Sequence, residues 1–227
     1  MNVGAPKRPG AARASPRSSA PQGEQAVVLK AGKEKSLRRR HPWVYATAVS
    51  HVTGDPAAGA TVAIRATDGT WLAWAAYSPA SSIRARAWSF SEQDVIDAAW
   101  MRDRVHAAVA ARAELATSST ALRLVFGESD RLPGLIVDRY ADQLVTQFQG
   151  AGVDAWRDEL VAALVEATGC ANVFDRSDGA TRAREGLPAI SGVLAGAEPP
   201  ETIEVGEHGL RFLVDVRRGG PSTWRRW

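Results

Sequence analysis

Between residues 26 and 90 the sequence consists of short apolar segments, each about as long as one β-strand and each ended by turn residues. Ala60–Arg65 and Trp71–Tyr77 flank an Asp-Gly pair, which is typical of a tight hairpin. In Ile83–Trp88 apolar and basic residues alternate, as expected for a strand with one buried face. Four or five such strands in so short a stretch predict a small β-barrel.

The second half of the chain mixes helical and strand periodicity. Ser91 can cap a connecting helix over residues 91–119, with apolar residues spaced by four through an alanine-rich stretch. A second helix is expected over 154–168, ended by Gly169. Further strands are expected at 122–126, 135–140, 144–148 and 172–175, with a hairpin of 202–205 and 210–216. These elements predict a small α+β domain over residues 120–216.

The composition is that of a globular protein. The 227 residues are 45% hydrophobic and 23% charged, and no apolar run approaches the roughly 20 residues that span a bilayer. The single cysteine, Cys170, cannot form an internal disulfide, which favours a reducing, cytoplasmic location and gives no reason to expect a membrane partner.

Positive charge is concentrated at the N-terminus. Residues 1–45 contain ten Lys and Arg against two acidic residues, whereas the other 182 residues contain 18 against 23. Such a basic segment on a slightly acidic protein predicts a polyanionic partner. Residues 1–25 have too little apolar surface to fold, so we expect a disordered basic tail there.

The best candidate for a binding site is a basic block next to aromatic rings. Phosphate oxygens bind cationic groups, and unstacked bases stack on rings or guanidinium planes, so the block predicts RNA contact. The alternative is a solvated charge run with Trp43 buried in the barrel. The predicted RNA-binding residues are Lys33, Lys35, Arg38, Arg39, Arg40, His41 and Trp43, with Arg84 and Arg86 extending the same surface.

A second motif, Gly150–Ala155, has the form G-x-G-x-x-A between a strand and a helix, with Asp175 after the next strand. This is the outline of a dinucleotide-binding fingerprint. Asp154, however, places a negative charge in the helical turn where a pyrophosphate would bind, and no further β-α units follow. Nucleotide binding is therefore the weaker alternative.

The acidic residues do not form a recognisable metal or acid–base motif. Glu128, Asp130, Asp175 and Asp178 lie beside Ser, Pro and Gly, which favours turns in which the side chains bond their own backbone. The four histidines lack zinc-ligand spacing, and no serine stands in a nucleophile elbow. We therefore predict no metal site and no catalytic residue.

Several sequence segments occur in a fixed order: Gly32–Val44, Tyr77–Ser81, Ile83–Arg86, Gly127–Asp130, Leu132–Tyr140, Asp175–Asp178, Glu185–Leu187 and Glu207–Leu210. Together they resemble the N-terminal half of bacterial 23S rRNA cytosine-5 methyltransferases that carry a PUA domain. The resemblance runs from about Val27 to Val216, which is most of the chain.

The resemblance implies a PUA-like RNA-binding domain at 26–90 and a central α+β domain at 120–216, with large-subunit rRNA as partner. In the family, a C-terminal Rossmann-like domain binds S-adenosylmethionine and supplies a cysteine that attacks the base. Cys170 does not match that cysteine, so we expect no cofactor bound by this chain. Similar proteins also suggest a homodimer.

After Val216 the chain departs from the family pattern, so we expect an aberrant tail at 217–227 and a truncated reading frame. The prediction is thus the RNA-binding and central domains of an S-adenosylmethionine-dependent rRNA methyltransferase, inactive as an isolated chain. A stand-alone RNA-binding or interaction module without catalysis is the alternative.

Overall fold

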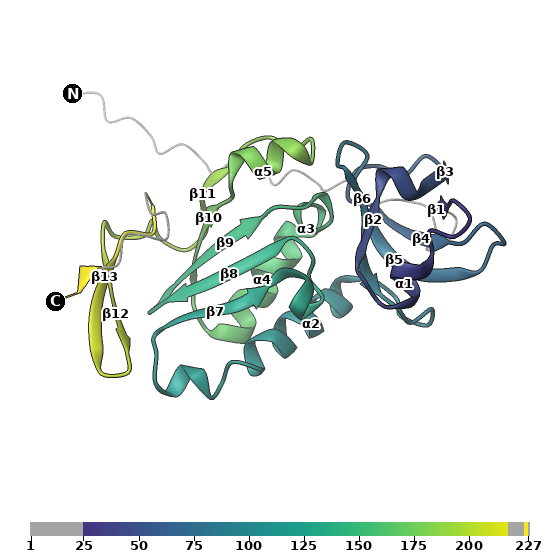
Figure 1. Cartoon of the computed structure of the whole chain (residues 1–227). Helices are drawn as coiled ribbons and strands as arrows, with labels where there is room; N and C mark the ends of the chain where they lie inside the picture. The colour runs from purple at the N-terminus through teal and green to yellow at the C-terminus, as the bar shows by residue number, and fades with distance from the viewer. Residues whose placement is uncertain (1–24, 218–224, 227) are drawn as a thin grey trace, which may run out of the picture.

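A computed structural model describes residues 25–217 and the backbone of Arg225 and Arg226. These residues form a curled six-stranded sheet, a five-stranded sheet with helices on one face, and a separate C-terminal hairpin (Figure 1). The expected mixed α+β fold with an N-terminal curled sheet is confirmed. Among the described helices none is long and apolar enough to cross a membrane.

The curled sheet has the strand order β2-β6-β5-β4-β1-β3, in which β1 and β4 are parallel and the other neighbours antiparallel. Its strands are β1 (Ala26–Leu29), β2 (Trp43–Tyr45), β3 (Val49–Thr53), β4 (Thr61–Arg65), β5 (Trp71–Tyr77) and β6 (Ile83–Ser89). The helical turns α1 (Lys35–Arg38) and η1 (Ala46–Ala48) lie in the connections on either side of β2.

Strands β5 and β6 are buried on both faces. Ala73 and Ala75 point into the core of the barrel, whereas Trp74 and Ala76 point outward into a core shared with the second sheet. Trp88 of β6 joins the same shared core. Burial on both sides explains why β5 is an almost continuous apolar run and not an alternating one.

The connecting helix α2 (Ala98–Ala110) begins later than the sequence predicts. Ser91 does not cap it; Asp97 does, and its carboxylate accepts a backbone N–H of the first turn at 2.8 Å. Upstream, the hydroxyl of Ser89 donates to Asp94 at 2.6 Å and so stabilises a loop where the helix was expected. The prediction failed because both serine and aspartate are good helix caps, and side-chain contacts decide between them.

The second sheet has the order β11-β10-β9-β8-β7. Only β9 and β10 are parallel, and two helical segments connect them across one face. The strands are β7 (Ala121–Phe126), β8 (Leu135–Tyr140), β9 (Gln143–Phe148), β10 (Asn172–Arg176) and β11 (Ser191–Ala195). Short helical elements η2 (Leu115–Thr117), η3 (Gly127–Asp130) and α5 (Gly179–Arg184) lie in the connections.

The helix expected over 154–168 is two helices. The chain turns at Trp156, which separates α3 (Ala151–Ala155) from α4 (Arg157–Thr168). Because α3 packs against β5 of the barrel and α4 packs beside α2 under the second sheet, one straight helix could not make both contacts. Gly169 adopts the left-handed conformation that ends α4, as predicted.

The C-terminal hairpin of β12 (Ile203–Glu207) and β13 (Leu210–Val214) packs against Val145 of β9. Strand β13 ends before the predicted residue 216, because the side chain of Asp215 accepts the backbone N–H of Arg217 and forms a turn. The backbone of β14 (Arg225–Arg226) pairs with β13.

The expected tail at residues 1–25 lies outside the described residues except for Gln25. The expected tail at 217–227 also lies outside them, apart from Arg217 and the β14 backbone.

The barrel and the second sheet meet at glycines. A Cβ atom added to Gly152 of α3 would lie 2.4 Å from the Cβ of Ala76 and 2.6 Å from a ring carbon of Trp88. On the barrel side, a Cβ at Gly59 would lie 2.5 Å from the carbonyl oxygen of Ala151. The backbone of α3 is therefore in direct contact with the outer face of the barrel.

We predict that Gly152→Ala lowers the free energy of unfolding by about 1–3 kcal/mol, because the added methyl group overpacks a filled core. Urea denaturation measures the change. Gly179→Ala is the matched control, since its new Cβ would meet its nearest atom at 3.6 Å, an ordinary contact. Equal stability of the two variants would contradict the close packing at Gly152.

Candidate nucleic-acid interface

The connection between β1 and β2 carries a cluster of exposed cationic side chains. Leu37, which is only 2% exposed, anchors α1 to the barrel core and leaves the residues around it facing solvent. Within residues 25–217 none of the Lys and Arg side chains of this cluster forms an ion pair. The exposed members are Lys33, Lys35, Arg38, Arg39, Arg40 and His41.

Arg40 ends α1 in an unusual backbone conformation. Its φ is 61°, and its N–H donates to the carbonyl of Leu37 at 2.7 Å while His41 N–H donates to Ser36 at 3.0 Å. This left-handed position after a helix is usually taken by glycine. Pro42 follows two residues after Arg40, so the helical turn cannot continue.

Three aromatic rings follow one another from His41, just before β2, along the outer face of that strand. His41 and Trp43 are T-shaped with centroids 5.7 Å apart, and Trp43 and Tyr45 are T-shaped at 6.3 Å. Tyr45 is 46% exposed and was missed by the sequence analysis, although the alternation from His41 onward would have indicated it. The row places planar groups beside the cationic cluster.

Trp43 lies between the two predictions made from the sequence, which were RNA contact and burial in the barrel. The residue is half-buried, and its indole N–H donates to Glu128 of η3 at 2.7 Å. This hydrogen bond joins the barrel to the second domain. Trp43 is therefore held in place by a contact within the chain.

Arg84 and Arg86 share the outer face of β6, but of the two only Arg86 forms an ion pair within residues 25–217. Arg86 forms a bidentate ion pair with Glu185, with both N–O distances at 2.8 Å, and Ser81 also donates to Glu185 at 2.6 Å. Glu185 is 4% exposed and lies just after α5. The charge of Arg86 is thus paired within the chain, at a contact between barrel and second domain.

Opposing effects set the pKa of Glu185. Burial alone would raise it, but the hydrogen bonds from Arg86 and Ser81 and the charge of Arg86 together outweigh burial and leave the pKa below the ordinary value of 4.5. Glu185 is therefore ionised at neutral pH. A depressed pKa stabilises the fold above the unfolded-state pKa, and this contribution is lost as pH falls through the folded-state value.

We predict that Glu185→Gln lowers the free energy of unfolding by about 3 kcal/mol at neutral pH, because it leaves Arg86 without its charged partner. The difference in the free energy of unfolding between this variant and the wild type should shrink as pH falls below 4.5. Urea denaturation across acidic pH measures it, with the exposed Glu201→Gln as control. A difference that stays constant with pH would show that Glu185 acts only by packing.

Three of the four acidic residues predicted to bond their own backbone do so, whereas Glu128 instead accepts the indole N–H of Trp43. Asp130 accepts the backbone N–H of Phe126 at 2.6 Å, Asp175 accepts that of Ser177 at 2.8 Å, and Asp178 caps α5. Asp130 also forms a bidentate ion pair with Arg112. Within the part of the chain that the structure describes, no group of three or more His, Cys, Asp and Glu side chains could hold a metal ion.

The segment Gly150–Ala155 serves as packing surface. Ala151, Gly152 and Val153 are buried, and the helix they begin has only five residues. Asp154 forms ion pairs with Arg157 and, at 2.8 Å, with Arg182. The spacing of these glycines is explained by contact with the barrel, which argues against the dinucleotide interpretation.

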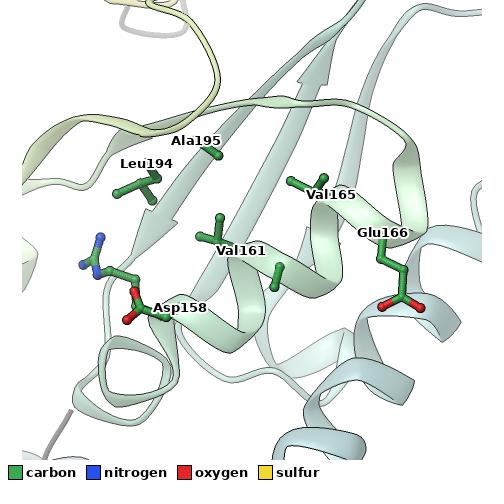
Figure 2. Close-up of a pocket in the computed structure, with 8 residues that line it drawn as sticks. Asp158, Val161, Val165, Glu166, Leu194 and Ala195 are labelled. Carbon is green, nitrogen blue, oxygen red and sulfur yellow. The ribbon is translucent and has the colours of Figure 1, made fainter. Parts of the chain in front are cut away.

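A cavity of about 530 Å³ lies between α4 and β11 (Figure 2). Figure 2 shows Val161 and Val165 pointing toward Leu194 and Ala195. Arg157 is the basic residue in its lining, and its guanidinium pairs with aspartates and stacks on Phe148 at 4.3 Å. This mainly apolar cavity does not suit a phosphate backbone.

Comparison with known proteins agrees with this geometry. Residues 27–90 match the family of PUA-like domains, so the expected PUA-like barrel is confirmed. The chain is 43% identical over 195 residues to ribosomal RNA large subunit methyltransferase I of Aliivibrio fischeri (strain MJ11), covering 85% of this chain and 49% of the relative. It is 44% identical over 200 residues to the protein of that name from Vibrio campbellii, covering 87% and 50%.

The chain spans about half the length of these relatives. A solved structure from Streptococcus mutans, described as a SAM-dependent methyltransferase, superimposes with a TM-score of 0.70 at 20% identity. The match covers 86% of this chain and 49% of that one, and it shows that the two share a fold.

Proposed function

We propose that this chain is the RNA-binding and central part of an S-adenosylmethionine-dependent methyltransferase that modifies a cytosine of 23S rRNA at carbon 5. The chain binds rRNA through the barrel and does not transfer methyl groups by itself. The observation that carries the proposal is the cationic cluster around α1, unpaired within the described residues and adjoining the rings of β2 on a PUA-like barrel.

The composition of this surface supports single-stranded RNA as the ligand. Exposed Lys and Arg side chains neutralise phosphates, and ring faces such as that of Tyr45 stack on unpaired bases of any sequence. The similarity to rRNA methyltransferases supports a ribosomal source for that RNA.

The one cysteine supports the absence of catalysis. A cytosine-5 methyltransferase needs a thiolate that attacks carbon 6 of the base, so the sulfur must reach the substrate. Cys170 is 5% exposed and belongs to a buried hydrophobic core that also contains residues of α4 and β10. Its sulfur cannot reach a base without unfolding of that core.

We predict that RNA affinity falls with salt and that Lys35→Gln, Arg38→Gln and Arg39→Gln together reduce the log–log slope by about 2. Each phosphate neutralised on a single strand contributes roughly 0.7 to the slope. Fluorescence anisotropy with labelled single-stranded rRNA fragments at several salt concentrations measures it.

The matched control replaces three exposed cationic residues elsewhere, with Arg102→Gln, Arg184→Gln and Arg211→Gln. This control has the same net charge as the Lys35, Arg38 and Arg39 variant, and its salt slope should equal that of the wild type. If the two triple variants lose slope equally, binding follows net charge and the cluster around α1 is not the site.

We further predict no methyl incorporation when the chain is incubated with tritiated S-adenosylmethionine and protein-free 23S rRNA. A curated relative such as the Aliivibrio fischeri methyltransferase, assayed in parallel, is the positive control. Any incorporation by the wild-type chain would overturn the proposed inactivity, and its loss in Cys170→Ser would in addition assign Cys170 a catalytic role.

A further inference from the structure

A cleft of about 660 Å³ lies between the barrel and the second domain, next to the cationic cluster. Three arginines from separate parts of the chain line it: Arg40 after α1, Arg104 on α2 and Arg131 after η3. Only Arg40 belongs to the surface predicted from the sequence. The other two are brought to it by the packing of the second domain against the barrel.

Two of these arginines occupy backbone positions that favour glycine. Arg40 has φ 61° and Arg131 has φ 60°, and each ends a short helical turn. At Arg131 the N–H of the residue itself and that of Leu132 donate to carbonyls of η3, at 3.2 and 3.0 Å. A side chain in this conformation is strained relative to glycine, so replacing either arginine by glycine removes the guanidinium without adding backbone strain.

The lining of the cleft combines cationic and anionic side chains. Neither Arg40 nor Arg131 forms an ion pair within residues 25–217. Arg104 lies over the ring of Trp100 at 5.3 Å, and its buried Nε has no hydrogen-bond partner among the described residues. Guanidinium groups without an ion-pair partner in the chain are free to donate charge-assisted hydrogen bonds to phosphate oxygens.

The same cleft contains two carboxylates, which an inorganic anion alone would not explain. Glu128 is held by the indole N–H of Trp43 at 2.7 Å and Asp94 by the hydroxyl of Ser89 at 2.6 Å. The hydrogen bond from Ser89 exceeds the opposing effect of burial and lowers the pKa of Asp94, so this group is an anion and a hydrogen-bond acceptor. Carboxylates accept hydrogen bonds from base amino groups and ribose hydroxyls.

We propose that the cleft between the barrel and the second domain holds one nucleotide of single-stranded RNA. Its phosphate contacts Arg40 and Arg131, and its base or ribose donors face Glu128 and Asp94. The inference rests on the proposed RNA-binding function and deepens it, because it extends the binding surface from the barrel to α2 and η3. An acidic peptide also offers carboxylates to the arginines and backbone N–H donors to the two acids. The similarity to rRNA methyltransferases is what favours RNA as the occupant.

The deciding variant is Arg131→Gly, which removes the guanidinium and relieves the backbone. The full chain should keep or raise its melting temperature, because glycine adopts φ 60° freely. Its affinity for labelled single-stranded RNA should fall roughly tenfold, as expected for one lost charge-assisted hydrogen bond, and the salt slope should fall by about 0.7. Arg40→Gly should behave in the same way.

Two controls separate the backbone effect from the charge effect. His208→Gly relieves another left-handed residue, φ 48°, in the C-terminal hairpin, and Arg211→Gln removes one exposed arginine from that hairpin. Both should bind RNA as the wild type does. If Arg131→Gly and Arg40→Gly also bind as the wild type while the Lys35, Arg38 and Arg39 variant is weakened, the cleft inference is wrong and the proposed function stands.

Two other results would overturn either the proposed function or the choice of RNA as the ligand. A wild-type chain without measurable RNA affinity would overturn the proposed function itself. Competition by polyglutamate as strong as that by unlabelled RNA, seen with the wild type and lost in Arg131→Gly, would assign the cleft to an acidic protein and overturn the RNA inference.

Discussion

The contact between the backbone of α3 and the outer face of the barrel holds the two sheets in one arrangement. At Gly152 no side chain separates the two surfaces, so Ala76 and Trp88 of the barrel lie directly on the helix. This contact belongs to a hydrophobic core that continues from β5 and β6 into α2, α4 and the second sheet. Directional bonds between the domains, from Trp43 to Glu128 and from Arg86 to Glu185, then fix their mutual orientation.

Much of the fold could be predicted because its strands follow local rules. Strands β5 and β8 have the predicted bounds, since turn residues end the apolar runs at both sides. Strands β2, β3 and β11 were missed because their side chains are partly exposed and their pattern is weak. The start of α2 and the break at Trp156 depend on contacts distant in sequence, and local propensity contains no information about those.

The candidate site, like the fold, could be predicted from the sequence only in part. The basic block was visible as composition, and its exposure follows from Leu37 being the one apolar anchor in α1. Whether a particular arginine is available to a ligand was not visible, because that depends on its partners in space. Arg86 looked equivalent to Arg84 in the alternating strand, yet it is engaged by a buried glutamate 99 positions later. Arg131, which stands in an inconspicuous turn, reaches the cleft only because η3 lies against the barrel.

Burial of β5 on both faces bears on how the chain can be divided. The family match ends at residue 90, which suggests a self-contained module. A fragment cut there would nevertheless expose Trp74, Ala76 and Trp88 to water, because their partners come from later in the chain. Such a fragment would be prone to aggregate. A unit that keeps this outer face covered therefore includes α3, and the hairpin loop at Gly209 is a better insertion point than the junction between the sheets.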